Sequence, residues 1–172
     1  QMTPDSAIRL ARRLEPYDPL WFEEPTPPEN PAAMARVAQH TTIPIATGER
    51  LTTKYEFARV LEAGAASILQ MALGRVGGIL EAKKIAAMAE AYYLGVAPHN
   101  PLGPVANAAA LHFALSTPNF LIQEDMLGDV PWRWDVVQSS LVNERGYWQP
   151  TTVPGLGIEI DEATAPVAEP AR

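Results

Sequence analysis

Short apolar runs that end in a polar residue alternate with longer amphipathic stretches along most of this chain. Continuous apolar runs of this length are typical of strands that are buried on both faces of a sheet. We therefore predict five strands, at residues 20–22, 43–46, 67–69, 95–97 and 120–122.

The amphipathic stretches between these runs have the period of helices. Thr3 and Asn30 each precede a proline, and Thr53 is followed three residues later by Glu56, which is the pattern of a capping box. Alternating helices and strands indicate a parallel sheet. The predicted helices are residues 4–14, 31–39, 54–63, 79–93 and 105–115.

Polar residues follow four of the five predicted strands, at Glu23, Glu49, His99 and Glu124, and Ala72 follows the other. These positions recur every 23 to 27 residues, the size of one strand-helix unit. A doubly wound open sheet has a similar repeat, but polar residues at the carboxyl ends of successive strands favour a (β/α) barrel, which builds its active site there. A barrel needs about 250 residues and eight strands, so we expect the first strands to precede Gln1.

The alternation ends after Asp125, where Trp, Pro and Gly become frequent. We predict an α/β fold with a partial barrel domain at residues 1–128 and a loop-rich tail at 129–172, in which Trp132, Arg133 and Trp134 are structural. The glycine-rich stretch 74–78 lacks the Lys-Ser/Thr ending of a phosphate-binding loop, and we interpret it as a tight strand-to-helix turn.

Composition limits the chemistry. The formal net charge of −7 argues against nucleic-acid partners and anionic membranes, which bind clustered basic residues. The sequence contains no cysteine, so a metal would need oxygen or histidine ligands, which favours a hard cation such as Mg²⁺. No long apolar run or leader segment is apparent, so we expect a cytoplasmic protein without membrane contact.

Glu23 and Glu49 are the candidate metal ligands, in the sequences Phe-Glu-Glu-Pro and Thr-Gly-Glu-Arg. Taken singly, a glutamate after a strand is more often a helix cap or an ion-pair partner. Two of them in register at the rim of one barrel instead indicate a Mg²⁺ site with positions left open for a carboxylate substrate.

His99 directly follows a strand, where an imidazole can exchange protons near neutral pH. Glu124 ends the last predicted strand and, if its surroundings keep it protonated, could donate to or orient a substrate carboxylate oxygen, although a purely structural role is equally compatible with its position. His40 and His112 lie on predicted helix ends or faces, and we interpret both as structural residues.

Six segments have a family likeness: 21–25 (Trp-Phe-Glu-Glu-Pro), 43–50 (Ile-Pro-Ile-Ala-Thr-Gly-Glu-Arg), 76–78 (Val-Gly-Gly), 97–104 (Ala-Pro-His-Asn-Pro-Leu-Gly-Pro), 122–124 (Ile-Gln-Glu) and 154–161 (Pro-Gly-Leu-Gly-Ile-Glu-Ile-Asp). In this order and spacing they resemble the mandelate racemase subgroup of the enolase superfamily, in particular its acid-sugar dehydratases. The resemblance runs from about Asp5 to Asp161. It implies the C-terminal part of a modified (β/α)7β barrel, whose capping domain and first strands lie upstream.

By that resemblance, Glu23 and Glu49 match the second and third Mg²⁺ ligands, His99 the catalytic histidine and Glu124 the carboxyl residue after the last strand, while Glu24 is a non-ligating neighbour. The first ligand, an Asp, would fall just before Gln1. The implied reaction removes the proton α to the carboxylate of an aldonate of the galactonate type. Loss of the β-hydroxyl from the Mg²⁺-stabilised enediolate then gives a 2-keto-3-deoxy acid. We expect this small-molecule enzyme to form a homo-oligomer.

One position departs from the family pattern. Where the subgroup commonly has Gln-Pro-Asp, with an Asp that pairs with the histidine, this chain has Gln70, Met71 and Ala72. Without that partner, His99 should be a weaker and less well-oriented base. Two alternatives therefore stay open: a racemase or epimerase that uses the same site, and a truncated or diverged barrel without catalytic activity.

Overall fold

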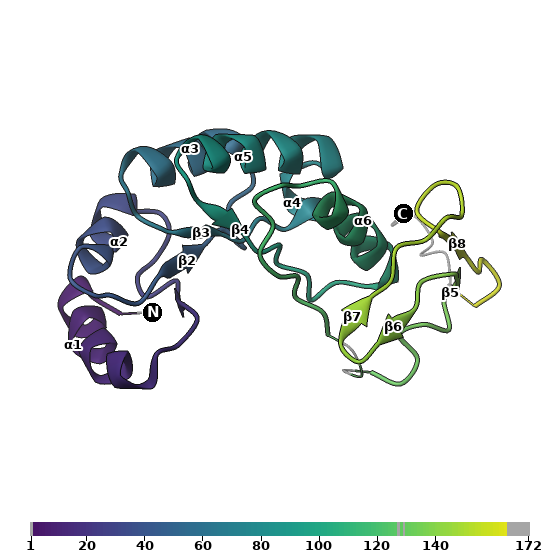
Figure 1. The fold of residues 1–172 in the computed structure, drawn as a ribbon, viewed down its shortest axis with the longest axis horizontal. Coiled ribbons are helices and arrows are strands. Elements are labelled where there is room, and N and C mark those ends of the chain that lie inside the picture. The colour runs from purple at the N-terminus through teal and green to yellow at the C-terminus, as the bar shows by residue number, and fades with distance from the viewer. Residues whose placement is uncertain (1, 127, 129, 165–172) are drawn as a thin grey trace, which may run out of the picture.

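The computed structural model describes residues 2–126, 128 and 130–164, which follow an arc with helices on its outer side and strands on its inner side (Figure 1). A four-stranded parallel sheet, in the order β1-β2-β3-β4, forms the middle of the arc. Its strands are β1 (Phe22–Glu23), β2 (Ile45–Thr47), β3 (Ile68–Leu69) and β4 (Gly95–Val96).

The five predicted helices are confirmed, with ends that differ from the prediction by at most two residues. The hydroxyl of Thr3 and the side-chain oxygen of Asn30 accept hydrogen bonds from the first turns of their helices, and both bonds of the Thr53–Glu56 capping box are present. The helices are α1 (Pro4–Leu14), α2 (Pro31–Ala38), α3 (Lys54–Glu62), α5 (Ile79–Ala91) and α6 (Pro104–Leu115), with a 3-10 turn, η1 (Glu15–Tyr17), after α1.

Successive residues of each strand point to opposite faces of the sheet. On the outer face, Ile45, Leu69 and Val96 pack with buried helix residues such as Phe57 and Ile85 in the main core. On the inner face, Ala46, Ile68 and Ala97 form a smaller cluster against Trp21. The helices therefore cover only the outer face, which leaves the inner face for a site.

The fifth strand was predicted at residues 120–122, but the structure gives this segment only one isolated parallel bridge, between Val96 and Phe120. The Leu121 N–H donates to the carbonyl of Val96 at 2.8 Å, and the next bond, from Glu124 N–H to the carbonyl of Pro98, lengthens to 3.4 Å. Pro98 has no N–H to return a bond, so the ladder cannot continue beyond this point.

The glycine-rich stretch is not a simple turn. It contains a one-turn helix, α4 (Leu73–Val76), which ends at Gly77 and Gly78, both with positive φ. A residue with positive φ ends a right-handed helix, and glycine adopts this conformation without steric cost. The connection between β3 and α5 is therefore longer and more structured than the sequence pattern indicated.

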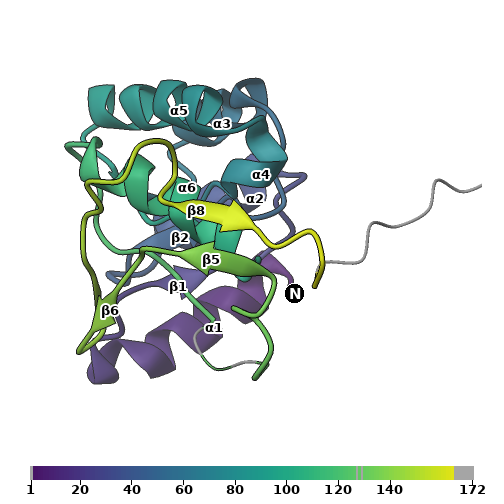
Figure 2. The ribbon, with the colours of Figure 1, turned by 90° about the vertical axis from the view of Figure 1, so that its right-hand side faces the viewer.

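Two small antiparallel ladders, which the sequence pattern did not predict, form part of the segment after residue 129. Their strands are β5 (Val137–Ser139) with β8 (Ile158–Ile160), and β6 (Asn143–Glu144) with β7 (Tyr147–Trp148). Figure 2 shows β5 and β8 side by side in front of α6. We call residues 130–164 the tail.

Side-chain hydrogen bonds join the tail to the loops that follow β4 and the bridge at Phe120. Arg133 is 5% exposed and donates to the carbonyl of Leu102, and Trp148 donates its indole N–H to Asp125 Oδ2 at 2.7 Å. The Trp134 ring lies 5.6 Å from that of Trp148. Arg133 and Trp134 thus have the structural role predicted for them, whereas Trp132 is mostly exposed. Within the described ranges, every helix is too short or too polar to span a lipid bilayer.

The capping box gives a pH-dependent prediction. Hydrogen bonds to the carboxylate of Glu56, of which the one from the Thr52 backbone N–H is the largest cause, lower its pKa. The folded state therefore binds this proton less tightly than the unfolded state, so the stabilisation is present above the ordinary glutamate pKa of about 4.3 and is lost as the pH falls below it. Glu56→Ala should cost about 1 kcal/mol at pH 7 in urea unfolding, and this cost should shrink below pH 4.

Glu62→Ala, on the last turn of the same helix, is the control and should change stability by less than about 0.5 kcal/mol. A cost for Glu56→Ala that stays constant between pH 7 and pH 3 would contradict the assignment of the cap to the carboxylate.

Candidate active site

A cleft of about 240 Å³ opens at the carboxyl ends of the strands. Three of the four predicted site residues line it, from three separate segments: Glu23 on β1, His99 after β4 and Glu124 after the bridge at Phe120. The other lining residues are Trp21, Gln70, Ala97, Pro98, Ile122 and Gln123.

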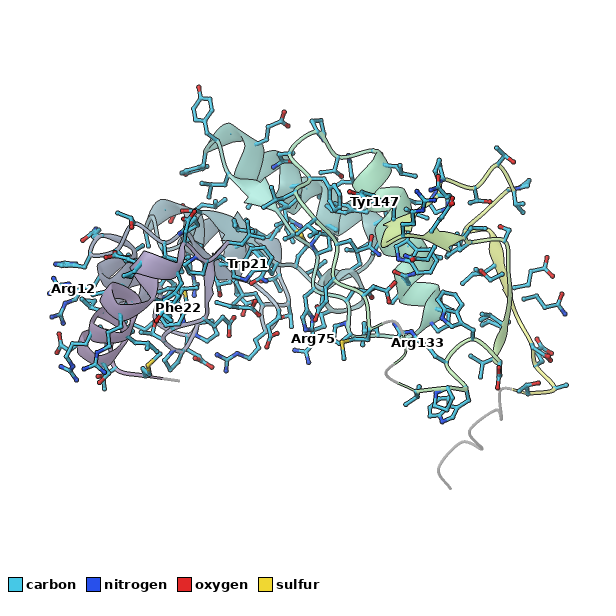
Figure 3. All side chains as sticks on the ribbon, turned by 60° about the horizontal axis from the view of Figure 1, so that its bottom comes forward. Arg12, Trp21, Phe22, Arg75, Arg133 and Tyr147 are labelled. Atoms are coloured by element: carbon cyan, nitrogen blue, oxygen red, sulfur yellow. The ribbon has the colours of Figure 1, made fainter. Side chains whose placement is uncertain are left out.

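Strand register explains why these residues meet. Glu23 pairs with Ala46, and Ala46 pairs with Ile68, so these three side chains share the inner face of the sheet. Gln70, two residues beyond Ile68, has the same orientation. In Figure 3, Phe22 lies on the side of α1 and Trp21 lies away from it, in agreement with their packing against the outer and inner clusters.

Two donors hold the Glu23 carboxylate. Its Oε2 accepts from the indole N–H of Trp21 at 3.0 Å and from the Gln70 amide at 2.8 Å. Within the described residues, no hydrogen bond uses Oε1 of Glu23. The carboxylate is therefore fixed in position but keeps one oxygen for a ligand.

The next residue, Glu24, has a different task. Its backbone has a positive φ of 35°, and its carboxylate accepts from the Thr47 hydroxyl at 2.9 Å and from Arg50 at 2.8 Å. Thr47 and Arg50 flank Glu49, so this buried carboxylate ties the end of β1 to the loop that carries the second candidate ligand. A charge used in this way is a structural link.

Glu49 lies against His99, with 3.1 Å between Glu49 Oε2 and His99 Nε2. Glu124 approaches the same nitrogen with its Oε2 at 3.9 Å, and that oxygen also accepts from the Asn100 backbone N–H at 2.8 Å. The structure thus brings the imidazole and two carboxylates together, and Glu23 lines the same cleft as His99 and Glu124.

The other ring nitrogen of His99, Nδ1, is buried and has no hydrogen-bond partner within the described residues. His99 donates its backbone N–H to the carbonyl of Met71 at 3.2 Å, which holds it beside the end of β3, and Ala72, the next residue there, is 1% exposed. A buried polar atom without a partner costs free energy. His99 therefore has a ring nitrogen without a partner among the described residues, in a chain that has Ala72 where the family pattern has an Asp.

The donor set suits a hard cation but is small. Among the described residues, no group of three or more His, Asp or Glu side chains is close enough together to hold a metal ion. Glu23 and Glu49 nevertheless each leave Oε1 without a hydrogen bond in that part of the chain, and carboxylate oxygens are the ligands that Mg²⁺ prefers. Each of the two residues therefore has the donor chemistry of a Mg²⁺ ligand.

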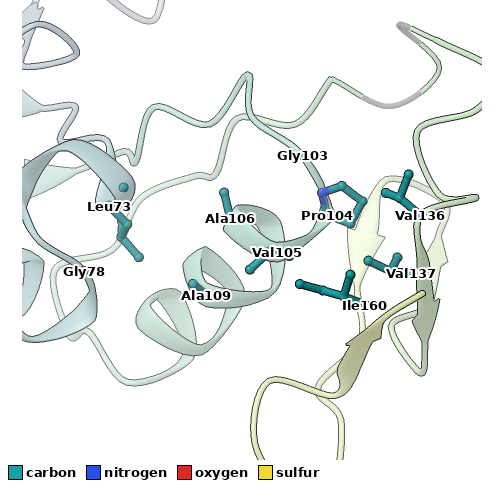
Figure 4. Close-up of a pocket in the computed structure, with 11 residues that line it drawn as sticks. Leu73, Gly78, Gly103, Pro104, Val105, Ala106, Ala109, Val136, Val137 and Ile160 are labelled. Carbon is teal, nitrogen blue, oxygen red and sulfur yellow. The ribbon is translucent and has the colours of Figure 1, made fainter. Parts of the chain in front are cut away.

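A second hollow is larger but chemically inert. It has a volume of about 520 Å³, lies between α6 and the β5–β8 ladder, and is lined by apolar side chains and glycines, among them Leu73, Val105 and Ile160 (Figure 4). No titratable side chain lines this cavity, so the larger volume does not make it a better candidate for the active site than the cleft at the strand ends.

Sequence reasoning missed Trp21 and Gln70, which position Glu23. The alternation of the strands could have indicated both, because Trp21 precedes Glu23 by two residues and Gln70 follows the paired inner-face position Ile68 by two. His40 and His112 do not line the cleft, and the ring of His40 bonds to the carbonyl of Arg36 at 2.7 Å.

Gly48 controls the loop that carries Glu49. Its φ is 142°, and a Cβ there would lie 2.8 Å from Phe57 Cε1 and 2.9 Å from backbone atoms of Gln70. Gly64 also has a positive φ, but it has open space around its Cβ position. Gly64→Ala should cost about 1–2 kcal/mol for backbone strain alone, and Gly48→Ala about 1–3 kcal/mol more, because it adds a steric clash.

Urea unfolding of the two variants measures this difference. Equal costs would mean that the Gln70 backbone and the Phe57 ring do not confine the loop before Glu49.

Comparison with known proteins places the fold in a family. Residues 1–164 match the family described as Enolase C-terminal domain-like. The D-galactonate dehydratase of Ralstonia pickettii is 48% identical over 161 residues, which are 90% of this chain and 42% of that protein. The chain thus spans less than half the length of this relative.

Solved structures agree. A protein from Burkholderia SAR-1 assigned to the mandelate racemase/muconate lactonizing enzymes has a TM-score of 0.91 and 59% identity, over 95% of this chain and 40% of that one. An enolase from Agrobacterium radiobacter, solved with bound Na and L-malate, has a TM-score of 0.87 and 37% identity, over 95% and 45% of the two chains. The chain belongs to the enolase C-terminal domain-like family, in the mandelate racemase subgroup of the enolase superfamily.

Proposed function

We propose that the protein containing this chain is a Mg²⁺-dependent dehydratase that converts a sugar acid, an aldonate of the galactonate type, into a 2-keto-3-deoxy acid. The observation that carries the proposal is the contact of His99 Nε2 with Glu49 Oε2 at 3.1 Å, with Glu124 beside it, at the strand ends of an enolase-type barrel. The 48% identity to a D-galactonate dehydratase supports the substrate class.

Glu23 and Glu49 would hold Mg²⁺, because each keeps a carboxylate oxygen without a hydrogen bond among the described residues. A bound Mg²⁺ supplies a Lewis acid for the carboxylate of the substrate, where negative charge develops as the α-proton leaves. Trp21 and Gln70 hold Glu23 ready for this, because their two N–H donors fix its other oxygen.

His99 would exchange protons through Nε2, because Nδ1 is buried. An ionised carboxylate only accepts hydrogen bonds, so the contact with Glu49 requires a proton on Nε2. To give a proton to the departing β-hydroxyl of the substrate, His99 must carry protons on both ring nitrogens, because loss of the Nε2 proton from a neutral ring would leave an imidazolate. Abstraction of the α-proton would instead require an Nε2 without a proton, which cannot hydrogen-bond to the carboxylate of Glu49. We infer that His99 acts as the acid of the elimination and that another group is the base.

Glu124 is more exposed than His99, with 42% of its side-chain surface accessible against 18%. Its Oε2 is fixed by the Asn100 N–H. This arrangement suits a group that accepts a hydrogen bond from a substrate hydroxyl while His99 delivers the proton.

Nδ1 of His99 has no partner within the described part of the chain, and this favours a second candidate, a diverged barrel without catalytic activity. A racemase or epimerase is the third, because proton removal next to the carboxylate is common to both reactions. The assay below separates the three.

Purified protein with Mg²⁺ should convert at least one member of a panel of hexonates and pentonates into a 2-keto acid, measured as the semicarbazone. His99→Asn should lower kcat/KM about 100-fold or more, because it removes an acid from the elimination. His40→Asn, a histidine outside the cleft, is the matched control and should stay within about twofold of the unchanged protein.

Exchange of the α-proton with deuterated solvent without 2-keto acid formation would instead identify a racemase or epimerase. If no member of the panel gives either exchange or product, the enzymatic proposals are rejected.

Metal binding can be measured without a substrate. Calorimetry should give a Mg²⁺ dissociation constant that rises at least tenfold in Glu23→Gln and in Glu49→Gln, because each substitution removes a charged oxygen ligand. Glu29→Gln, an exposed residue outside the cleft, is the control and should leave the constant unchanged. Equal affinity in all three variants would exclude Glu23 and Glu49 as ligands.

A further inference from the structure

Asn107 is a polar residue in the first turn of helix α6, and it is fully buried at 0% exposure. Its side-chain oxygen accepts two hydrogen bonds, from the Asn100 amide at 3.1 Å and from the Gln123 amide at 2.5 Å. A carbonyl oxygen has two lone pairs, so these two donors use its full capacity.

The two donors are neighbours of the two candidate catalytic residues. Asn100 follows His99 in the loop after β4, and Gln123 precedes Glu124 in the segment after the bridge at Phe120. One oxygen atom on α6 is therefore the common attachment point for both sides of the cleft.

The backbone alone holds these segments poorly. Sheet pairing stops after the bridge between Val96 and Phe120, and the last backbone bond between the segments, from Glu124 to Pro98, is 3.4 Å long. Beyond it, the connections are made by side chains: the two amides on Asn107, and Glu124 Oε2, which accepts from the Asn100 N–H at 2.8 Å.

We propose that Asn107 is a positioning residue, whose side-chain oxygen sets the separation of His99 and Glu124 by binding the residue next to each. It touches neither the cleft nor any reacting atom, and acts only through Asn100 and Gln123. The geometric claim stands by itself, and only its effect on turnover rests on the proposed dehydratase function.

Asn107→Leu tests the proposal, because leucine has a similar volume but no acceptor. Asn107→Asp keeps an acceptor for both amides and should restore the contacts. The matched control is Asn119→Leu, since Asn119 also binds two partners, the carbonyls of Ala86 and Leu94 at 3.0 and 2.9 Å, but lies outside the cleft.

The first measurement needs no substrate. The Asn100 N–H bonds to Glu124, so its hydrogen exchange reports whether the two sides of the cleft stay together. Relative to the amides of α5, exchange at Asn100 should accelerate at least tenfold in Asn107→Leu, and remain within threefold of the unchanged protein in Asn107→Asp and Asn119→Leu. If hydrogen exchange at Asn100 accelerates equally in the two leucine variants, Asn107 contributes only to general packing and the proposal is overturned.

The second measurement is turnover. Asn107→Leu should lower kcat at least tenfold with KM changed less than threefold, whereas Asn119→Leu should leave kcat within twofold. If the unchanged protein turns over no sugar acid, the proposed function fails, and the exchange experiment alone decides the role of Asn107.

Gln123→Leu provides a second route if Asn107→Leu does not fold. It removes one of the two donors from a half-buried position and should give an intermediate acceleration at Asn100. No acceleration in Gln123→Leu would count against the proposal.

Discussion

The parallel register of four short strands is the constraint on which the candidate site depends. Each strand is only two or three residues long, yet the pairing of Glu23 with Ala46 and of Ala46 with Ile68 aligns their carboxyl ends. Because the helices bury the outer face, a shift of one residue would turn the inner-face side chains into the core. The hydrophobic core therefore determines which side chains face the cleft.

Much of this arrangement follows from patterns that are local in the sequence. Apolar runs and helix caps predicted the five helices and four strands, since burial and capping act over a few neighbouring residues. The fifth strand was over-predicted, because Pro98 on the neighbouring segment has no backbone N–H to donate to it. Helix α4 was missed, because a helix of one turn is too short to show a hydrophobic period. The boundary between the barrel domain and the tail, and the homo-oligomer, remain predictions.

The candidate site was predicted less completely than the fold. The recurrence of polar residues after strands indicated Glu23, Glu49, His99 and Glu124, but the roles assigned to them await experiment. The contacts that support these residues join segments far apart in the sequence, such as Glu24 with Arg50 and Asn107 with Gln123. No short-range pattern predicts such pairs, because they depend on side-chain direction in the folded chain.

Asp125 adds a consequence for the tail. The residue directly follows Glu124, and its carboxylate accepts the indole N–H of Trp148 from β7 and contacts Arg133 at 3.5 Å. Gln123, on the other side of Glu124, is anchored to α6. The two neighbours of Glu124 are thus bound to a helix of the barrel and to a hairpin of the tail. A protease cut in that hairpin would therefore loosen one wall of the cleft while leaving the sheet itself intact.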